Sequence, residues 1–413
     1  MEVLSLVEYE RLDLDDLDSA VAERLRDEHG SRIEIRSPWE NRQRWGLTSL
    51  GWVGFLPVTP EFGLSLQPKV PLASLFRMLE VAYRLAEFRT DGLFDAGSVD
   101  DLFELLASIL ARRVLDRVRH GLYRAYVEEE RELRFLRGRL DLLGHARTPW
   151  RIALPCRFEE HTPDLDDNQI LLWTLLRIAR SGLCRREESA ARVRRACKAL
   201  GGIVSVAPFI GSDATGRIYH QLNADYEPLH ALCRFFLDHL GPAHELGDRP
   251  MLPFLVDMAR LFEKFVEAWL SSHLPPYLKT RPQETVPLGT GTQVRFAIDI
   301  EILHLPSGRT LAVLDTKYKN QGFPQSADVQ QVIAYAEACD CHHAFLVYPQ
   351  ELESPFRGEL ENHTVETLAF PLDGDLDAAG ERFLEQLLTR LEPKVAALEA
   401  GAQDGVLAGK DAG

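Results

Sequence analysis

The sequence predicts an α+β protein of several domains, and three observations carry this prediction. Residues 1–72 alternate short apolar segments with Gly and Pro, which indicates a small N-terminal β-rich module. Residues 73–245 show mainly helical periodicity, with a strand-rich insert at about 121–161. Residues 246–392 follow the order helix, strand, strand, helix, strand, which predicts a C-terminal α/β domain. The remaining residues, 393–413, are small, polar and Gly-rich, and predict a disordered tail.

The N-terminal module begins with a short helical stretch and continues with three strand-like pieces. These are "RIEIRSP", "RWGLTSLGWVGFLPV" and "FGLSLQPKV". With 413 residues, the chain is long enough to add such a module to two larger domains with sizeable cores.

The insert in the helical middle domain consists of "LYRAYVEEERELRFLRGRLDL" and "WRIALPCRFEEHT". Gly138 suits a bend between strands. The strands are polar and carry Arg134, Arg137 and Arg139, so they have little apolar surface to bury against a helical domain. We therefore expect the insert to project and to contact a partner. Basic stretches of this kind also occur as solvated helix and strand faces, and that alternative stays open.

Two strands of the C-terminal domain form a predicted hairpin. Apolar residues alternate with Asp299 in "VRFAIDIEI", the segment "LPSGR" provides a turn, and "TLAVLDTKY" follows as a central strand. Asp315 and Lys317 share one face of the second strand, and hairpin pairing can bring Asp299 across to meet them. The sequence thus predicts two carboxylates and an ammonium group at one end of the hairpin.

Such a cluster suits a hard divalent cation. Carboxylate oxygens of Asp299 and Asp315, with the backbone carbonyl of Thr316, are ligands of the kind that Mg²⁺ prefers, and Lys317 can orient an attacking water. This pattern predicts metal-assisted hydrolysis of a phosphodiester. An isolated Asp-x-Lys on a strand is usually a surface ion pair, so the interpretation depends on the neighbouring elements.

Predicted helices flank the hairpin. Upstream, "DMARLFEKFVEAWL" has an apolar stripe with Glu263 beside it, a candidate third carboxylate whose alternative is a solvated helix face. Downstream, "SADVQQVIAYAEAC" places Gln331 and Tyr335 one turn apart. The apolar strand "HHAFLVYP" follows.

The order of these elements, with Asp299, Asp315, Lys317 and Gln331 in place, resembles the core of the PD-(D/E)xK nuclease fold. The chain further resembles the McrC subunit of McrBC-type modification-dependent restriction systems from about Leu75 to about Pro371. The matching segments are "MARLFEKFV", "AIDIEI", "LDTKYK", "DVQQVIAYA", "FLRGRLDL", "PCRFEEHTPDLDDNQILLWTLL" and "HALCRFFLDHL". Ile298 stands where many members of the superfamily have proline, and Gln330 where an aromatic residue is common, but both carboxylates are retained.

The resemblance implies a Mg²⁺-dependent DNA endonuclease of a phage-defence restriction system, with Mn²⁺ as a substitute ion. It implies that an McrB-like AAA+ GTPase oligomer recognises modified double-stranded DNA and translocates, while this chain cuts and stimulates the GTPase through a projection. We expect no nucleotide on this chain itself, because "GTGTQ" lacks the lysine of a P-loop. The alternatives are a non-catalytic adaptor that activates an NTPase ring, and a stand-alone repair nuclease of the same fold.

The composition indicates a cytoplasmic protein without a membrane span. The net charge is −16, which argues against a protein that holds DNA by bulk charge alone. No apolar run approaches the roughly 20 residues of a membrane-spanning helix, and the acidic start is unlike a signal peptide. The six cysteines are scattered and are expected to be reduced.

Overall fold

The computed structural model describes residues 2–408 with short gaps. The gaps are residues 42, 60, 86–97, 148–149, 242–243, 247–248, 252, 288–294, 319–321 and 361. The chain forms two compact units, one of residues 55–61 and 87–255 and the other of residues 2–54, 62–86 and 256–413. The predicted mixed α/β architecture with several sheets is confirmed. The division differs from the boundaries expected at residues 72 and 245, because the N-terminal strands belong to the same unit as the C-terminal sheet.

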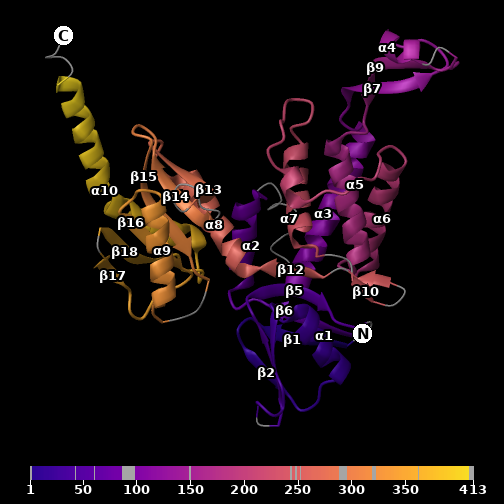
Figure 1. The fold of residues 1–413 in the computed structure, drawn as a ribbon. Helices are drawn as coiled ribbons and strands as arrows, with labels where there is room; N and C mark the ends of the chain where they lie inside the picture. The colour runs from indigo at the N-terminus through magenta and orange to yellow at the C-terminus, as the bar shows by residue number, and fades with distance from the viewer. Residues whose placement is uncertain are drawn as a thin grey trace. The chain divides into compact units, whose positions relative to one another are not determined.

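The first unit is built mainly from helices (Figure 1). They are α3 (Val99–His120), α5 (Asp166–Ser181), α6 (Glu187–Gly201) and α7 (Tyr226–His239), with the short elements η3 (Gly211–Ala214), β10 (His244–Leu246) and β11 (Arg249–Met251). The Ser98 side chain caps α3 by accepting a hydrogen bond from the Asp101 amide. Phe103 lies at the centre of the apolar core, with its ring centroid 5.9 Å from that of Phe235 and 4.4 Å from that of Phe254.

The predicted strand-rich insert is an antiparallel ribbon. Strands β7 (Ala125–Leu133) and β9 (Leu154–Thr162) pair along their whole lengths, and β8 (Arg139–Leu140) joins β9. A short helix, α4 (Leu142–Arg147), lies near the tip. Figure 1 shows the ribbon extending away from α3 and α5. The expected bend at Gly138 is present: its φ is +68°, and an added Cβ would lie 2.4 Å from the carbonyl oxygen of Arg157.

The second unit begins with the N-terminal strands. Strands β1 (Glu2–Val7) and β6 (Phe62–Gln67) pair in parallel, whereas β2 (Arg11–Leu14), β4 (Trp45–Ser49) and β3 (Ile33–Arg36) form an antiparallel sheet in that order. The predicted short helix is α1 (Ser19–His29), capped by Asp18. Two of the boundaries between the units fall within strands, namely β5 (Trp52–Pro57) and β12 (Phe254–Asp257).

The largest sheet of this unit has six strands in the order β13-β14-β15-β16-β18-β17. Their bounds are β13 (Leu278–Pro287), β14 (Arg295–His304), β15 (Arg309–Thr316), β16 (His343–Tyr348), β17 (Arg357–Leu360) and β18 (His363–Ala369). Helix α9 (Ser326–Ala338) packs on this sheet through Val332 and Ala336, which belong to a cluster with Val313 and Leu346.

Three further helices complete the second unit. They are α2 (Leu72–Tyr83), α8 (Met258–His273) and α10 (Leu376–Ala408). The apolar stripe predicted for α8 is buried, and Phe265 contacts Phe370 with ring centroids 4.9 Å apart. In the described residues α10 continues past Pro393 to Ala408, where composition alone predicted a disordered tail. Alanine and leucine favour helix strongly enough to tolerate the amide hydrogen bond that Pro393 lacks.

The cysteines, the apolar character of the helices and the segment "GTGTQ" were considered from the sequence above. None of the six cysteines is paired in a disulfide. Within the described residues, no helix combines the length and apolar character needed to cross a membrane. The segment "GTGTQ" at 289–293 lies outside the described residues.

Candidate functional site

The hairpin of β14 and β15 forms as the sequence predicts. The two strands pair with Ile300 opposite Leu314, and the turn between them contains Gly308 at a φ of +67°. Continuing this register by one residue brings Asp299 opposite Asp315 on the same face of the sheet. Strand β15 also pairs in parallel with β16, and the Lys317 amide donates a 2.8 Å hydrogen bond to the Val347 carbonyl. The end of β15 is therefore fixed on both sides.

Side-chain contacts hold the two carboxylates in different ways. The amide and the hydroxyl of Thr316 donate to Asp299 Oδ2 at 2.8 Å and 3.0 Å. Lys317 Nζ lies 2.7 Å from Asp315 Oδ2 in an ion pair whose side chains are 13% and 3% exposed. The structure thus brings together Asp299, Asp315 and Lys317, whose proximity the alternation pattern predicted, and Thr316 binds Asp299 beside them.

Helix α9 supplies the other side of the cluster. Lys317 Nζ donates to Gln331 Oε1 at 3.0 Å, and Gln331 Nε2 in turn donates to the Tyr335 hydroxyl at 2.6 Å. Gln331 and Tyr335 lie one turn apart on α9, so their side chains can bond to each other. These hydrogen bonds connect Gln331 and Tyr335 to Lys317.

Burial sets the electrostatics of the cluster. Burial, and then the charge of Asp299, raises the pKa of Asp315 from 3.8 to about 7, against the opposing effect of Lys317. Burial likewise raises the pKa of Asp299, although the hydrogen bonds from Thr316 oppose it. Burial alone would lower the pKa of Lys317, but Asp315 and Asp328 hold it above its usual value. The cluster therefore has two carboxylates whose charged forms are unfavourable without an additional cation.

Asp328 is a member of the cluster that sequence analysis missed. It lies in the first turn of α9, is buried, and places Oδ1 3.6 Å from Lys317 Nζ. The available signal was its spacing of three residues from Gln331, which puts both side chains on one helix face.

Glu263 is the remaining predicted site residue. It is half-buried on α8, directly after Phe262, whose ring packs against Tyr318 with centroids 6.0 Å apart. Its role as a third carboxylate stays a prediction.

The donor set fits a hard cation with waters completing its coordination. The buried carboxylate of Asp315 and the half-buried carboxylate of Asp299 face each other across the hairpin. Burial raises the pKa of both, as expected of groups that a cation would stabilise. In the described part of the chain, no group of three or more His, Cys, Asp and Glu side chains is arranged to hold a metal. The carboxylates of Asp299 and Asp315 and the carbonyl of Thr316 stay the predicted metal ligands.

The three predicted partner-binding arginines all lie on the insert and are exposed. The Arg137 guanidinium lies 4.0 Å from the centroid of the Phe158 ring and 3.8 Å from Glu160, whereas Arg139 lines an open cavity of about 740 Å³. Sequence analysis missed a set of exposed apolar side chains around them. These are Phe135, Leu136, Leu142, Leu143, Trp150 and Ile152, each more than 60% exposed.

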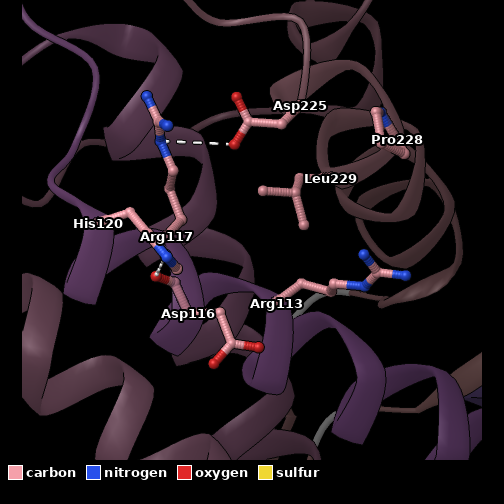
Figure 2. Close-up of a pocket in the computed structure, with 7 residues that line it drawn as sticks. All are labelled: Arg113, Asp116, Arg117, His120, Asp225, Pro228 and Leu229. Carbon is pink, nitrogen blue, oxygen red and sulfur yellow. Dashed lines mark hydrogen bonds and ion pairs between the residues drawn. The ribbon is translucent and has the colours of Figure 1, made fainter.

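Basic side chains near the end of α3, among them Arg117, make contacts within the first unit (Figure 2). Arg117 donates to the Leu222 carbonyl, lies 3.5 Å from Asp225 and stacks over the Tyr226 ring, and Arg119 pairs with Asp116. A cavity of about 240 Å³ lies beside them. Arg117 and Arg119 are thus both paired with acidic groups of the same unit.

Fold and site together define a multidomain mixed α/β protein with an acidic pair and a lysine at the end of a central hairpin. The chain belongs to the family described as McrBC 5-methylcytosine restriction system component, whose model matches residues 47–349. No curated protein matches the sequence.

Two solved structures from Thermococcus gammatolerans are similar to this chain. One is a chain of the "refined half-complex from tetradecameric assembly of Thermococcus gammatolerans McrB AAA+ hexamers with bound McrC", with 18% identity, a TM-score of 0.55, and coverage of 94% of this chain and 100% of that chain. The other belongs to the "cryo-EM structure of the Thermococcus gammatolerans McrBC complex", with 21% identity, a TM-score of 0.42, and coverage of 68% of this chain and 90% of that chain. At 18% identity, the first likeness concerns the fold alone.

Proposed function

We propose that this chain is the endonuclease subunit of an McrBC-type system and cuts DNA by metal-dependent hydrolysis at Asp299, Asp315 and Lys317. The observation that carries the proposal is the pairing of the buried Asp315 with the half-buried Asp299, beside the 2.7 Å contact between Lys317 and Asp315. Membership of the family supports the assignment to a restriction system. The PD-(D/E)xK assignment rests on the sequence resemblance and on the strand order around β14 and β15.

Each residue has a distinct part in this chemistry. Asp299 and Asp315 would hold Mg²⁺, or Mn²⁺ in its place, and the bound ion supplies Lewis-acid stabilisation of the phosphate and of an attacking water. Thr316 fixes the orientation of Asp299 through two hydrogen bonds. Lys317 presents its ammonium group where negative charge develops on the phosphate, and Gln331 and Asp328 fix that ammonium group from α9.

A partner GTPase fits the rest of the chain. The family is described as a component of a restriction system, and one chain similar in fold comes from an assembly of McrB AAA+ hexamers with bound McrC. The insert carries exposed arginines and six exposed apolar side chains on one ribbon, an arrangement typical of protein contacts. We assign the contact with an McrB-like AAA+ oligomer to this ribbon, and the recognition of modified double-stranded DNA to that partner.

A metal-dependent cleavage assay tests the nuclease. The chain is mixed with its GTPase partner, GTP and methylated DNA, with Mg²⁺ or with EDTA. Asp315→Asn keeps the side-chain shape and removes a charged ligand, so cleavage is expected to disappear while folding persists. Asp27→Asn, an exposed position in the same unit, serves as the matched control. Mg²⁺-dependent cutting by Asp315→Asn at the rate of this control would end the assignment.

Two sets of substitutions test the insert. The triple variant Arg134→Ala, Arg137→Ala and Arg139→Ala removes its charge, and the pair Trp150→Ala and Ile152→Ala removes apolar surface. Both are expected to weaken complex formation and the stimulation of GTP hydrolysis, because large exposed apolar and arginine side chains dominate binding energy. Arg180→Ala with Arg195→Ala, exposed on α5 and α6, is the control. Unchanged stimulation by both insert variants would place the contact elsewhere.

A further inference from the structure

The strand that carries Lys317 ends in a buried tyrosine. Tyr318 follows Lys317 directly, is 7% exposed, and donates a hydrogen bond of 3.2 Å to Glu8 Oε2. Glu8 is fully buried at the end of β1, and its Oε2 also accepts a hydrogen bond from the Lys69 amide at 3.3 Å. A residue near the N-terminus thus holds the chain immediately after the proposed catalytic lysine.

The backbone around Glu8 fixes the position of its carboxyl group. The Glu8 amide donates to the Gln67 carbonyl at 2.9 Å, and the next amide, that of Tyr9, donates to the Ser49 carbonyl at 3.0 Å. Glu8 Oε1 is buried and lacks a hydrogen-bond partner among the described residues. A buried carboxyl oxygen without a hydrogen-bond partner costs folding free energy, so its retention calls for an explanation.

The same N-terminal segment contacts the helix that carries Glu263. The Met258 amide, in the first turn of α8, donates to the Gly51 carbonyl at 3.0 Å. Gly51 has a φ of +80°, and an added Cβ would lie 2.5 Å from the Tyr9 hydroxyl, so the backbone approaches closely here. Further along α8, Lys264 Nζ donates to the Tyr83 hydroxyl of α2 at 3.2 Å. The α8 helix is thus held at its start and in its middle.

Tyr318 connects these two sets of contacts. Its ring packs against Phe262 of α8, and its hydroxyl reaches Glu8. A cavity of about 90 Å³ beside it is lined by Tyr9 and Lys69 from the N-terminal segment and by Pro349 from the end of β16. Tyr318 therefore lies among N-terminal residues on one side and elements of the six-stranded sheet on the other.

We infer that Glu8 and Tyr318 are positioning residues for the proposed nuclease site: Glu8 fixes the Tyr318 hydroxyl, and Tyr318 fixes the end of β15 that presents Lys317. This inference deepens the proposed function and rests on it. Glu8 lies before residues 47–349, which match the family model, so the family match does not include this contact. The N-terminal segment is then part of the nuclease unit and sets the geometry of its site.

Conservative substitutions separate this role from a general effect on folding. Tyr318→Phe keeps the ring on Phe262 and removes only the hydroxyl, and Glu8→Ala removes the acceptor. Glu8→Gln retains a carbonyl oxygen that can accept from Tyr318 and should rescue the site. The controls are Tyr277→Phe and Glu359→Ala, at exposed positions of the same unit.

The position of Lys317 can be observed without any activity. Lysines are dimethylated with ¹³C-formaldehyde, and the Lys317 methyl signal is identified by its loss in Lys317→Ala. The signal is expected to shift in Tyr318→Phe and Glu8→Ala, and to stay at the wild-type position in Glu8→Gln and both controls. In the full complex with the partner GTPase, unmethylated Tyr318→Phe is expected to lose about tenfold to hundredfold in kcat for DNA cleavage with KM unchanged, since small displacements of a positioned group act on turnover.

The outcomes separate the inference from the proposed function. An unmoved Lys317 signal in Tyr318→Phe overturns the inference even if the wild type cleaves DNA. A shifted signal together with a wild type that does not cleave supports the positioning contact and overturns the nuclease. A shift with wild-type kcat in Tyr318→Phe shows that the displacement does not matter for turnover and overturns the positioning role.

Discussion

Removing one carboxylate from the acidic pair should stabilise the protein. In the folded chain the pKa of Asp315 is raised from 3.8 to about 7, first by burial and then by Asp299. One unit of pKa corresponds to about 1.4 kcal/mol, so ionised Asp315 destabilises the fold by up to about 4 kcal/mol relative to the protonated form. Asp315→Asn removes this charge, while Lys317 retains Asp328 at 3.6 Å and the hydrogen bond to Gln331. Allowing for the lost ion pair, we expect a net gain of about 1–3 kcal/mol in the free energy of unfolding.

The sign of the pH dependence follows from the raised pKa. A group that binds its proton more tightly when folded contributes stability that is present below its unfolded pKa of about 4 and is lost as the pH rises through about 7. The advantage of Asp315→Asn should therefore be small at about pH 4, grow as the pH rises, and be full above about pH 8.

Urea denaturation in EDTA, with Asp27→Asn as control, measures this difference. A variant that is less stable than wild type above pH 8, or a difference that does not change with pH, would refute the electrostatic reasoning.

Three further predictions concern single contacts. Lys317→Ala should have the opposite effect to Asp315→Asn and destabilise the metal-free protein by about 1–3 kcal/mol, because it leaves neighbouring buried carboxylates without their cation; urea denaturation measures it. Burial raises the pKa of Glu8 to about 7, against the hydrogen bonds from Lys69 and Tyr318, so Glu8→Gln should gain stability over wild type as the pH rises from about 5 to about 8, by at most about 3 kcal/mol; equal slopes of stability against pH would contradict this. Gly138→Val should disturb the insert, because the φ of Gly138 is +68° and a Cβ would meet the Arg157 carbonyl. Binding to the GTPase is expected to weaken, while the effect of Mg²⁺ on the stability of the other unit is expected to stay at the wild-type value.

Local patterns predicted the core of the site. The period of two in "AIDIEI" and "LDTKY" fixed which residues share a strand face, and the turn at Gly308 set the pairing, so the proximity of Asp299, Asp315 and Lys317 followed from short-range rules. The family resemblance placed Gln331 among the site residues, and its hydrogen bond to Lys317 came from the structure.

Contacts between distant segments could not be predicted in this way. Glu8 meets Tyr318 across 310 positions of sequence, and nothing in the pattern of β1 marks the carboxylate that follows this strand as buried. Asp328 looked like an ordinary acidic residue of a first helical turn, and only the packing of α9 on the sheet brings it near Lys317.

The most direct measurement follows DNA cutting and GTP hydrolysis in the same assembled complex. With Asp315→Asn in place of wild type, the single-turnover rate of cleavage is expected to fall by more than about hundredfold, while GTP hydrolysis by the partner remains at the wild-type rate. That result would separate a nuclease subunit from an adaptor with structural carboxylates. If Asp315→Asn cuts DNA at the wild-type rate, in a complex that still hydrolyses GTP, the result would contradict the account.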